Sequence, residues 1–185
     1  MRRAGYVLVG GRSRRMGRDK ALLPYRGMTL VEHIAGQVRA AAGSVALVGP
    51  PEKYRHLGLP VMADQRHGCG PLGGLHAILS TTGAEWNLVV ACDMPGLAAE
   101  FLEELLERAE SMRARCLAPR SPGGQAEPLC AVYHRTALAI VEGALEAGVR
   151  RLTEVLGLLE AAYIPRGEPG WFRNANTPQE WIIHG

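Results

Sequence analysis

The sequence lacks the features that mark membrane and secreted proteins. Its longest apolar runs, such as residues 88–92, are far shorter than the ~20 residues that a membrane-spanning helix needs. No signal-peptide pattern precedes the strand-like segment that follows Met1. We therefore expect a cytoplasmic protein that does not contact a membrane.

Cysteines and aromatic residues are also sparse. The four cysteines form no C-x-x-C pair, and none of the six histidines stands at metal-ligand spacing from them. Neither a zinc site nor a disulfide framework is therefore expected. Aromatic residues make up only 5% of the chain and the net charge is +3, which argues against nucleic acid as a partner.

What remains is the composition of an ordinary globular protein. The 185 residues include 47% hydrophobic and 21% charged residues, and the mean hydropathy is -0.03. These values lie outside the range of disordered and fibrous chains. Because the sequence contains no linker or internal repeat, we expect one domain over residues 1–185.

Apolar segments with strand and helix patterns alternate along the chain. Short apolar runs predict strands at 6–9, 45–48, 59–62, 86–92, 115–118, 128–133 and 161–164. Helical spacing predicts helices at 29–42, 73–82, 99–112, 136–147, 151–156 and from 177 onward. Strands that are apolar throughout are typical of a parallel sheet covered on both faces. The predicted fold class is therefore α/β, with a three-layer architecture and a mostly parallel sheet.

A glycine-rich, cationic segment follows the first predicted strand. Gly10 and Gly11 free the backbone to approach a ligand, and a cluster of arginines at 12–18 is followed by Lys20. Open α/β sheets bind ligands at the carboxyl ends of their strands. Backbone N–H groups and cations at that place suit a polyphosphate.

The alternative for this segment is a solvated, arginine-rich loop. It is not a Walker loop, because no Lys-Ser or Lys-Thr pair follows Gly17. Lys20 favours the phosphate interpretation, since the chain has only two lysines against 19 arginines. A lysine in such a chain suggests that a compact point charge is needed there.

Residues 68–73 match the pattern G-x-G-x-x-G, but their context does not fit a dinucleotide site. Residues 64–67 separate the glycines from the preceding strand, and Pro71 removes an N–H group that a pyrophosphate would need. We instead expect Pro71 at the first position of the following helix.

Two aspartates end predicted strands that follow each other along the chain. Asp93 follows the apolar run 88–92, and Asp64 follows the preceding strand. A carboxylate at that edge could bind Mg²⁺ together with substrate phosphates. The alternative is that Asp93 caps the local turn or the helix after Pro95.

The motifs of the chain resemble those of a known enzyme family. Residues 8–23 resemble the opening L-A-G-G-x-S-x-R-M-G-x-D-K-x-L-L of small nucleotidyltransferases, most closely that of the molybdenum cofactor guanylyltransferases. Residues 70–74, 92–95 and 174–178 resemble later motifs of that family in the same order. The segments G-P-L-x-G and C-D-M-P favour the guanylyl branch over its cytidylyl relatives.

The resemblance implies a Rossmann-like α/β/α fold and an enzyme that transfers GMP from GTP to the terminal phosphate of molybdopterin, with release of pyrophosphate. It implies catalytic roles for Arg15, Lys20 and Asp93, with Asp93 as the ligand of Mg²⁺. The residues that would contact GTP are Leu8, Val9, Gly10, Gly11, Lys20, Asp64 and Asp93. Asn174 and Asn176 become candidates for the pterin or metal side, although one residue of that segment could instead cap a helix. A protein that delivers or receives the cofactor is a candidate partner.

Two alternative functions remain open from the sequence. One is a cytidylyl- or sugar-nucleotidyltransferase on the same scaffold, and the other is a nucleotide-binding module without catalysis. Val48 and Gly49 stand where some family members have an asparagine near the nucleotide, so the sequence predicts no base-recognition contact. The expected chemistry needs no protein nucleophile, because the acceptor phosphate is already largely ionised at neutral pH.

Overall fold

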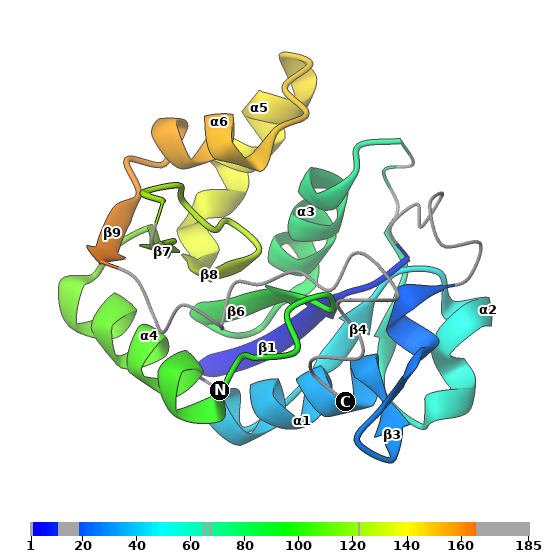
Figure 1. Cartoon of the computed structure of the whole chain (residues 1–185). Helices are drawn as coiled ribbons and strands as arrows, with labels where there is room; N and C mark the ends of the chain where they lie inside the picture. The colour runs from blue at the N-terminus through cyan, green and yellow to red at the C-terminus, as the bar shows by residue number, and fades with distance from the viewer. Residues whose placement is uncertain (1, 11–18, 65, 67, 122, 166–185) are drawn as a thin grey trace.

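A central sheet of seven strands organises the fold of the computed structural model, which describes residues 2–10, 19–64, 66, 68–121 and 123–165. The strands are β1 Arg3–Leu8, β4 Ala46–Val48, β5 Val61–Met62, β6 Trp86–Ala91, β7 Cys116–Arg120, β8 Cys130–His134 and β9 Ala162–Pro165. Their order is β5-β4-β1-β6-β8-β7-β9 (Figure 1). Only β8 in this sheet runs against its neighbours β6 and β7. The predicted α/β class with a mostly parallel sheet is confirmed.

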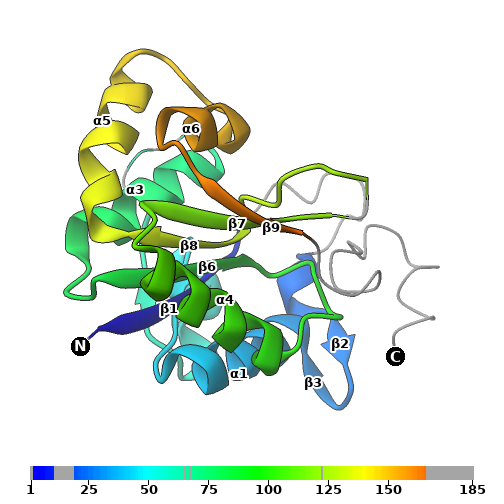
Figure 2. The ribbon, with the colours of Figure 1, turned by 90° about the vertical axis from the view of Figure 1, so that its left-hand side faces the viewer.

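Helices cover both faces of the sheet. They are α1 Leu30–Ala42, α2 Pro51–Tyr54, α3 Pro71–Thr81, α4 Ala99–Met112, α5 Leu138–Glu146 and α6 Leu152–Leu158. Helices α1 and α4 lie on one face, and α3, α5 and α6 lie on the other (Figure 2). Alternate residues of β6 serve the two faces: Leu88 and Val90 belong to the core under α1 and α4, and Val89 to the core under α3 and α5. The predicted three layers are therefore present.

Most predicted elements lie within a few residues of the observed ones. The best example is α1, where Thr29 and Glu32 form the predicted capping box and Gly43 ends the helix in the left-handed region. Strand β6 is not apolar throughout, because it contains the fully buried Asn87, whose side chain bonds to Thr82 and to the Tyr133 carbonyl. The helix predicted from residue 177 lies outside the described residues.

Several short elements were not predicted. They are the hairpin β2 Pro24–Tyr25 and β3 Met28–Thr29, the helix α2, and the 3-10 turns η1 Lys20–Leu22 and η2 Arg55–Leu57, whereas a third such turn, η3 Arg135–Ala137, begins the helix predicted at 136–147. None of them is long enough to show a hydrophobic period. Two of them, η1 and α2, turn out to matter for the candidate site.

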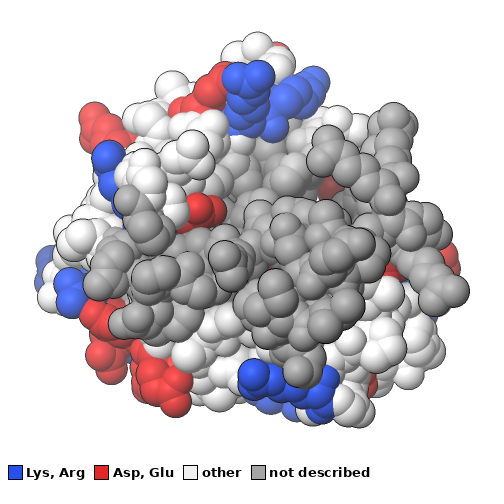
Figure 3. Space-filling model, viewed as in Figure 1, with Lys and Arg blue, Asp and Glu red and all other residues white. Residues whose placement is uncertain are grey.

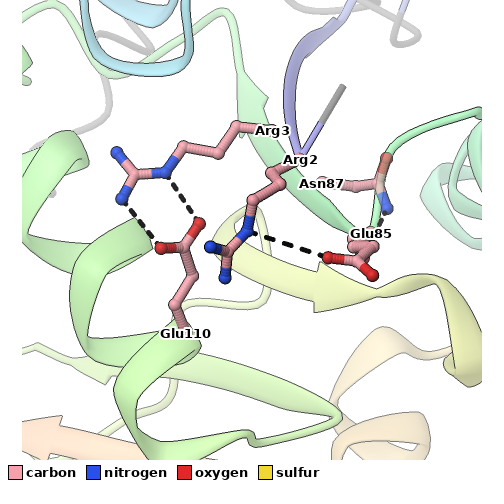
Figure 4. A network of polar contacts seen from close by, with 5 residues as sticks. All are labelled: Arg2, Arg3, Glu85, Asn87 and Glu110. Atoms are coloured by element: carbon pink, nitrogen blue, oxygen red, sulfur yellow. Dashed lines mark hydrogen bonds and ion pairs between the residues drawn. The ribbon is translucent and has the colours of Figure 1, made fainter.

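The amino-terminal edge of the sheet holds a network of paired charges (Figure 4). The Arg3 guanidinium donates two hydrogen bonds to the Glu110 carboxylate at 2.8 and 3.0 Å, and Arg2 lies 3.9 Å from Glu85. A hollow of about 420 Å³ opens beside them. Because these acids and bases neutralise one another, we assign a stabilising role to this edge.

The Arg3–Glu110 pair allows a test of this assignment. Its side chains are only 26% and 18% exposed, and the hydrogen bonds from Arg3 lower the pKa of Glu110. Glu110→Gln is expected to lower the free energy of unfolding by about 1 kcal/mol at neutral pH, as measured by urea unfolding.

The loss should shrink as the pH falls through the folded-state pKa of Glu110, because the wild-type carboxylate is then protonated as well. Glu104→Gln is the control, since Glu104 pairs with Arg108 on the exposed surface of α4, and its loss should cost much less. Equal losses in both variants would contradict a structural role for the buried pair.

Candidate functional site

Residues that adjoin five strands, three of them carboxylates, meet at the carboxyl edge of the sheet. Gly10 follows β1, Pro50 follows β4, Asp64 follows β5 and Asp93 follows β6. These strands are parallel, so their ends meet at one edge. Because β8 is antiparallel, its beginning reaches the same edge and brings Glu127. This is the edge at which open α/β sheets bind ligands.

Gly10 makes the sharp turn that leaves β1. Its φ is +84°, and a Cβ atom at this position would lie 2.6 Å from Cδ of Pro50, so no other residue fits without movement. The preceding N–H, that of Val9, donates to the Val48 carbonyl at 2.9 Å. That N–H belongs to the sheet, so any contact of Val9 with a nucleotide would use another of its groups.

Asp19 fixes the start of the turn that carries Lys20. One carboxylate oxygen, Oδ1, accepts a hydrogen bond from the Ala21 N–H at 3.1 Å and so caps η1. The other, Oδ2, accepts a hydrogen bond from the hydroxyl of Tyr54 at 2.7 Å. Tyr54 is fully buried, and the nearby Gly10 backbone opposes the rise of its pKa that burial and Asp19 cause.

Lys20 and Asp93, two predicted site residues from distant parts of the chain, interact at this edge. Asp93 is half-buried, and burial raises the pKa of its carboxyl group, while the nearby Lys20 ammonium opposes that rise. A half-buried carboxylate with a perturbed pKa is a candidate for a functional site. Asp93 could bind a metal cation when an anionic ligand such as a polyphosphate is present.

Asp93 does not cap helix α4, which is one half of the capping alternative. That helix begins several residues later, and its N-cap is Ala98, which contributes no side-chain hydrogen bond. The Ala99 N–H instead donates a hydrogen bond to Oε1 of Gln37 at 2.9 Å. Capping of the local turn by Asp93 and a ligand-binding role for it both stay predictions.

Glu127 is a site residue that the sequence analysis missed. Its pKa is raised by burial and then by the negative charge of Asp93, so the two carboxylates lie close enough to repel each other. The turn before β8 holds it in place, because its N–H donates to Pro119 and its carbonyl accepts from Cys130. Its only signal in the sequence is an acid beside Pro128 in a glycine-rich loop.

Cys92, next to Asp93, is not arranged as a nucleophile. Burial raises the pKa of its thiol, and the negative charges of Asp93 and Asp19 raise it further. The thiol is therefore protonated at neutral pH and a poor nucleophile. This fits a reaction that needs no covalent intermediate with the protein.

Asp64 lies at the beginning of α3. Its Oδ1 accepts the Arg66 N–H at 2.9 Å, and both oxygens would lie 2.8 Å from a Cβ atom on Gly73. Pro71 stands in the first turn of α3, as predicted. Glycine at 73 thus leaves room for the carboxylate against the helix.

Four of the predicted site residues, Gly11, Arg15, Asn174 and Asn176, lie outside the described residues. Within the described part, no group of three or more His, Cys, Asp or Glu side chains is arranged to hold a metal. A metal here would therefore rely on one or two carboxylates of the protein.

The surface of the described residues shows mixed charge. On the face that Figure 3 shows, acidic and basic side chains form small separate groups. This agrees with the small net charge of +3. None of the described helices combines the length and apolar character that crossing a bilayer requires.

The mostly parallel sheet between two layers of helices is the fold that the resemblance to small nucleotidyltransferases implies. The chain belongs to the MobA-like NTP transferase domain family, whose model matches residues 5–162. This confirms the resemblance found in the sequence.

Individual relatives agree with this assignment. A probable molybdenum cofactor guanylyltransferase from Carboxydothermus hydrogenoformans is 38% identical over 136 residues, which cover 74% of this chain and 68% of the relative. The molybdenum cofactor guanylyltransferase of Syntrophotalea carbinolica is 33% identical, covering 95% of this chain and 87% of its own. The crystal structure of molybdopterin-guanine dinucleotide biosynthesis protein A from Archaeoglobus fulgidus has a TM-score of 0.83 and 28% identity, covering 98% and 96% of the two chains.

Proposed function

We propose that the protein is a molybdenum cofactor guanylyltransferase that joins GMP from GTP to the terminal phosphate of molybdopterin. The observation that carries this proposal is the proximity of Lys20 to the half-buried Asp93 at the carboxyl edge, where the Lys20 charge opposes the rise of the Asp93 pKa, in a chain of the MobA-like family. The guanylyltransferase names of its relatives favour GTP over CTP and favour catalysis over simple nucleotide binding.

The chemistry is an in-line displacement at the α-phosphorus of GTP. A terminal phosphate oxygen of molybdopterin forms the new P–O bond, the bond from the α-phosphorus to the bridging oxygen breaks, and pyrophosphate leaves with that electron pair. The attacking phosphate is largely dianionic at neutral pH, since its second pKa is ~6, so no general base is needed. The protein contributes positioning and charge neutralisation.

The site residues that the structure describes have separate roles in this reaction. The turn at Gly10 gives the triphosphate access to the backbone, and Lys20 neutralises negative charge on it. Asp64, at the first turn of α3, would meet the nucleotide. We propose the same phosphate-side role for Gly11 and Arg15, and a pterin-side or metal-side role for Asn174 and Asn176, on the family resemblance alone.

The residues present fit a magnesium ion. Mg²⁺ prefers oxygen ligands and commonly takes one or two carboxylates together with substrate phosphates and water, and Asp93 with Glu127 nearby supplies carboxylates at the required place. Bound there, the ion would neutralise charge on the phosphate oxygens as pyrophosphate departs. We propose Asp93 as its direct ligand.

A nucleotide panel tests the proposed function. The protein is incubated with molybdopterin, Mg²⁺ and each of GTP, CTP, ATP and UTP, and pyrophosphate release is measured. GTP is expected to be preferred over CTP by about tenfold or more, which corresponds to only ~1.4 kcal/mol of differential transition-state binding.

Omission of molybdopterin is the control for simple hydrolysis of the nucleotide. Equal or greater use of CTP would move the protein to the cytidylyl branch. Nucleotide binding without pyrophosphate release in any reaction would identify a binding module.

A further inference from the structure

Tyr54 connects two points of the chain that are far apart in sequence. Its hydroxyl donates to Oδ2 of Asp19 at 2.7 Å, and it lies close enough to the Gly10 backbone for that backbone to oppose the rise of its pKa. Gly10 follows β1, and Asp19 precedes η1. The buried hydroxyl thus holds Asp19 beside the turn that leaves β1.

The connection continues from Asp19 to the reacting edge. Oδ1 of Asp19 caps η1 by accepting the Ala21 N–H, and Lys20 is the first residue of that turn. The ammonium of Lys20 in turn acts on Asp93. The position of Lys20 therefore depends on the Asp19 carboxylate, which accepts hydrogen bonds from the Ala21 N–H and from the Tyr54 hydroxyl.

Packing alone does not explain a tyrosine at position 54. Its side chain is fully buried, and it is the one residue of α2 that belongs to the core. A phenylalanine would fill the same space without the cost of burying a hydroxyl. Burial and the Asp19 charge raise the pKa of Tyr54, so the hydroxyl keeps the proton that it donates.

We propose that Tyr54 is a positioning residue for nucleotidyl transfer, whose hydroxyl holds Asp19 beside the Gly10 turn and so fixes Lys20 relative to Asp93. The proposal rests on the proposed function, because it assigns Tyr54 to the same phosphate-binding edge. It predicts that the hydroxyl acts on the reaction only through the turn that carries Lys20.

Tyr54→Phe tests the proposal, because it removes the hydroxyl and keeps the ring. We expect kcat/KM for GTP to fall by about 10-fold to 100-fold, the range expected when a hydrogen bond to a charged group is lost. The same change made in a Lys20→Ala protein should then alter kcat/KM by less than about twofold, because the group through which Tyr54 acts is already absent.

Tyr6→Phe is the matched control. The Tyr6 side chain is buried in the other core, under α3, and its hydroxyl donates to Oγ1 of Thr82 at 3.1 Å. This variant should lose some stability in urea unfolding but keep the kinetic constants of the wild type. An equal kinetic loss in Tyr6→Phe, or an equal loss from Tyr54→Phe with and without Lys20, would overturn the proposal in favour of a general structural effect.

A measurement that needs no activity separates this proposal from the proposed function. Hydrogen exchange of the Ala21 amide reports the cap that Asp19 makes. Exchange at Ala21 should become faster in Tyr54→Phe, and unchanged exchange would overturn the proposal. A wild-type protein that transfers no nucleotide would refute the proposed function, while the exchange result would still decide whether Tyr54 fixes this turn.

Discussion

Asp93→Asn is expected to lower the rate of guanylyl transfer by about 10²–10³-fold, the scale seen when one preorganised electrostatic contact is lost. The carboxylate would be replaced by an amide of the same shape, which is a much weaker ligand for Mg²⁺. Binding of GTP, measured by calorimetry, should change far less than turnover, because the ion chiefly stabilises charge that develops in the transition state.

The stability of this variant separates the metal role from a structural one. Because burial raises the folded-state pKa of Asp93, the ionised carboxylate costs stability at neutral pH, and this cost disappears as the pH falls through the raised value. An asparagine carries no such cost, so Asp93→Asn should be at least as stable as the wild type at neutral pH without added metal.

The control is Glu146→Gln, which removes a negative charge from an exposed position at the end of α5. It should leave both turnover and stability unchanged. A folded Asp93→Asn protein with wild-type, Mg²⁺-dependent turnover would exclude Asp93 as the metal ligand.

Lys20→Ala should produce the second large effect, a loss of about 10²-fold in turnover with GTP. The ammonium neutralises phosphate charge close to the half-buried Asp93, where water screens less than at the open surface. Thermal unfolding should shift little by comparison. Steady-state kinetics and a melting curve on the same preparation measure both quantities.

The chain provides a matched control for this prediction in its only other lysine. Lys53 is exposed on α2, one residue before Tyr54, so Lys53→Ala removes the same charge without removing a group from the site. If Lys20→Ala were as active as Lys53→Ala, the phosphate-binding role of the glycine-rich segment would have to be abandoned.

The proximity of Lys20 and Asp93 could be predicted because the signals that place them are local. Each follows a recognisable strand, and the carboxyl ends of parallel strands meet at one edge. The alternation of apolar runs and helical periods likewise predicted the layers, since those patterns reflect burial on one or two faces. A pattern of this kind needs several consecutive residues, and helix α2 with only four was therefore missed.

Tyr54 and Glu127 could not be predicted, for two different physical reasons. The role of Tyr54 depends on a hydrogen bond to a residue 35 positions away in sequence, which no local pattern encodes. Glu127 reaches the site only because β8 is antiparallel. A buried apolar strand has the same sequence pattern in either direction, and a parallel β8 would have carried Glu127 to the opposite edge.

Because β8 runs in the opposite direction, the carboxyl edge of the sheet is built from two kinds of chain connection, tight turns and a surface loop. The nucleotide side is built from turns tied into the sheet and to α2 through Gly10 and Tyr54, whereas Glu127 comes from the surface connection between β7 and β8. Surface connections accept changes of length and sequence at small entropic cost. The connection around Glu127 can therefore change in length and sequence while the turns at Gly10 and Tyr54 stay as they are.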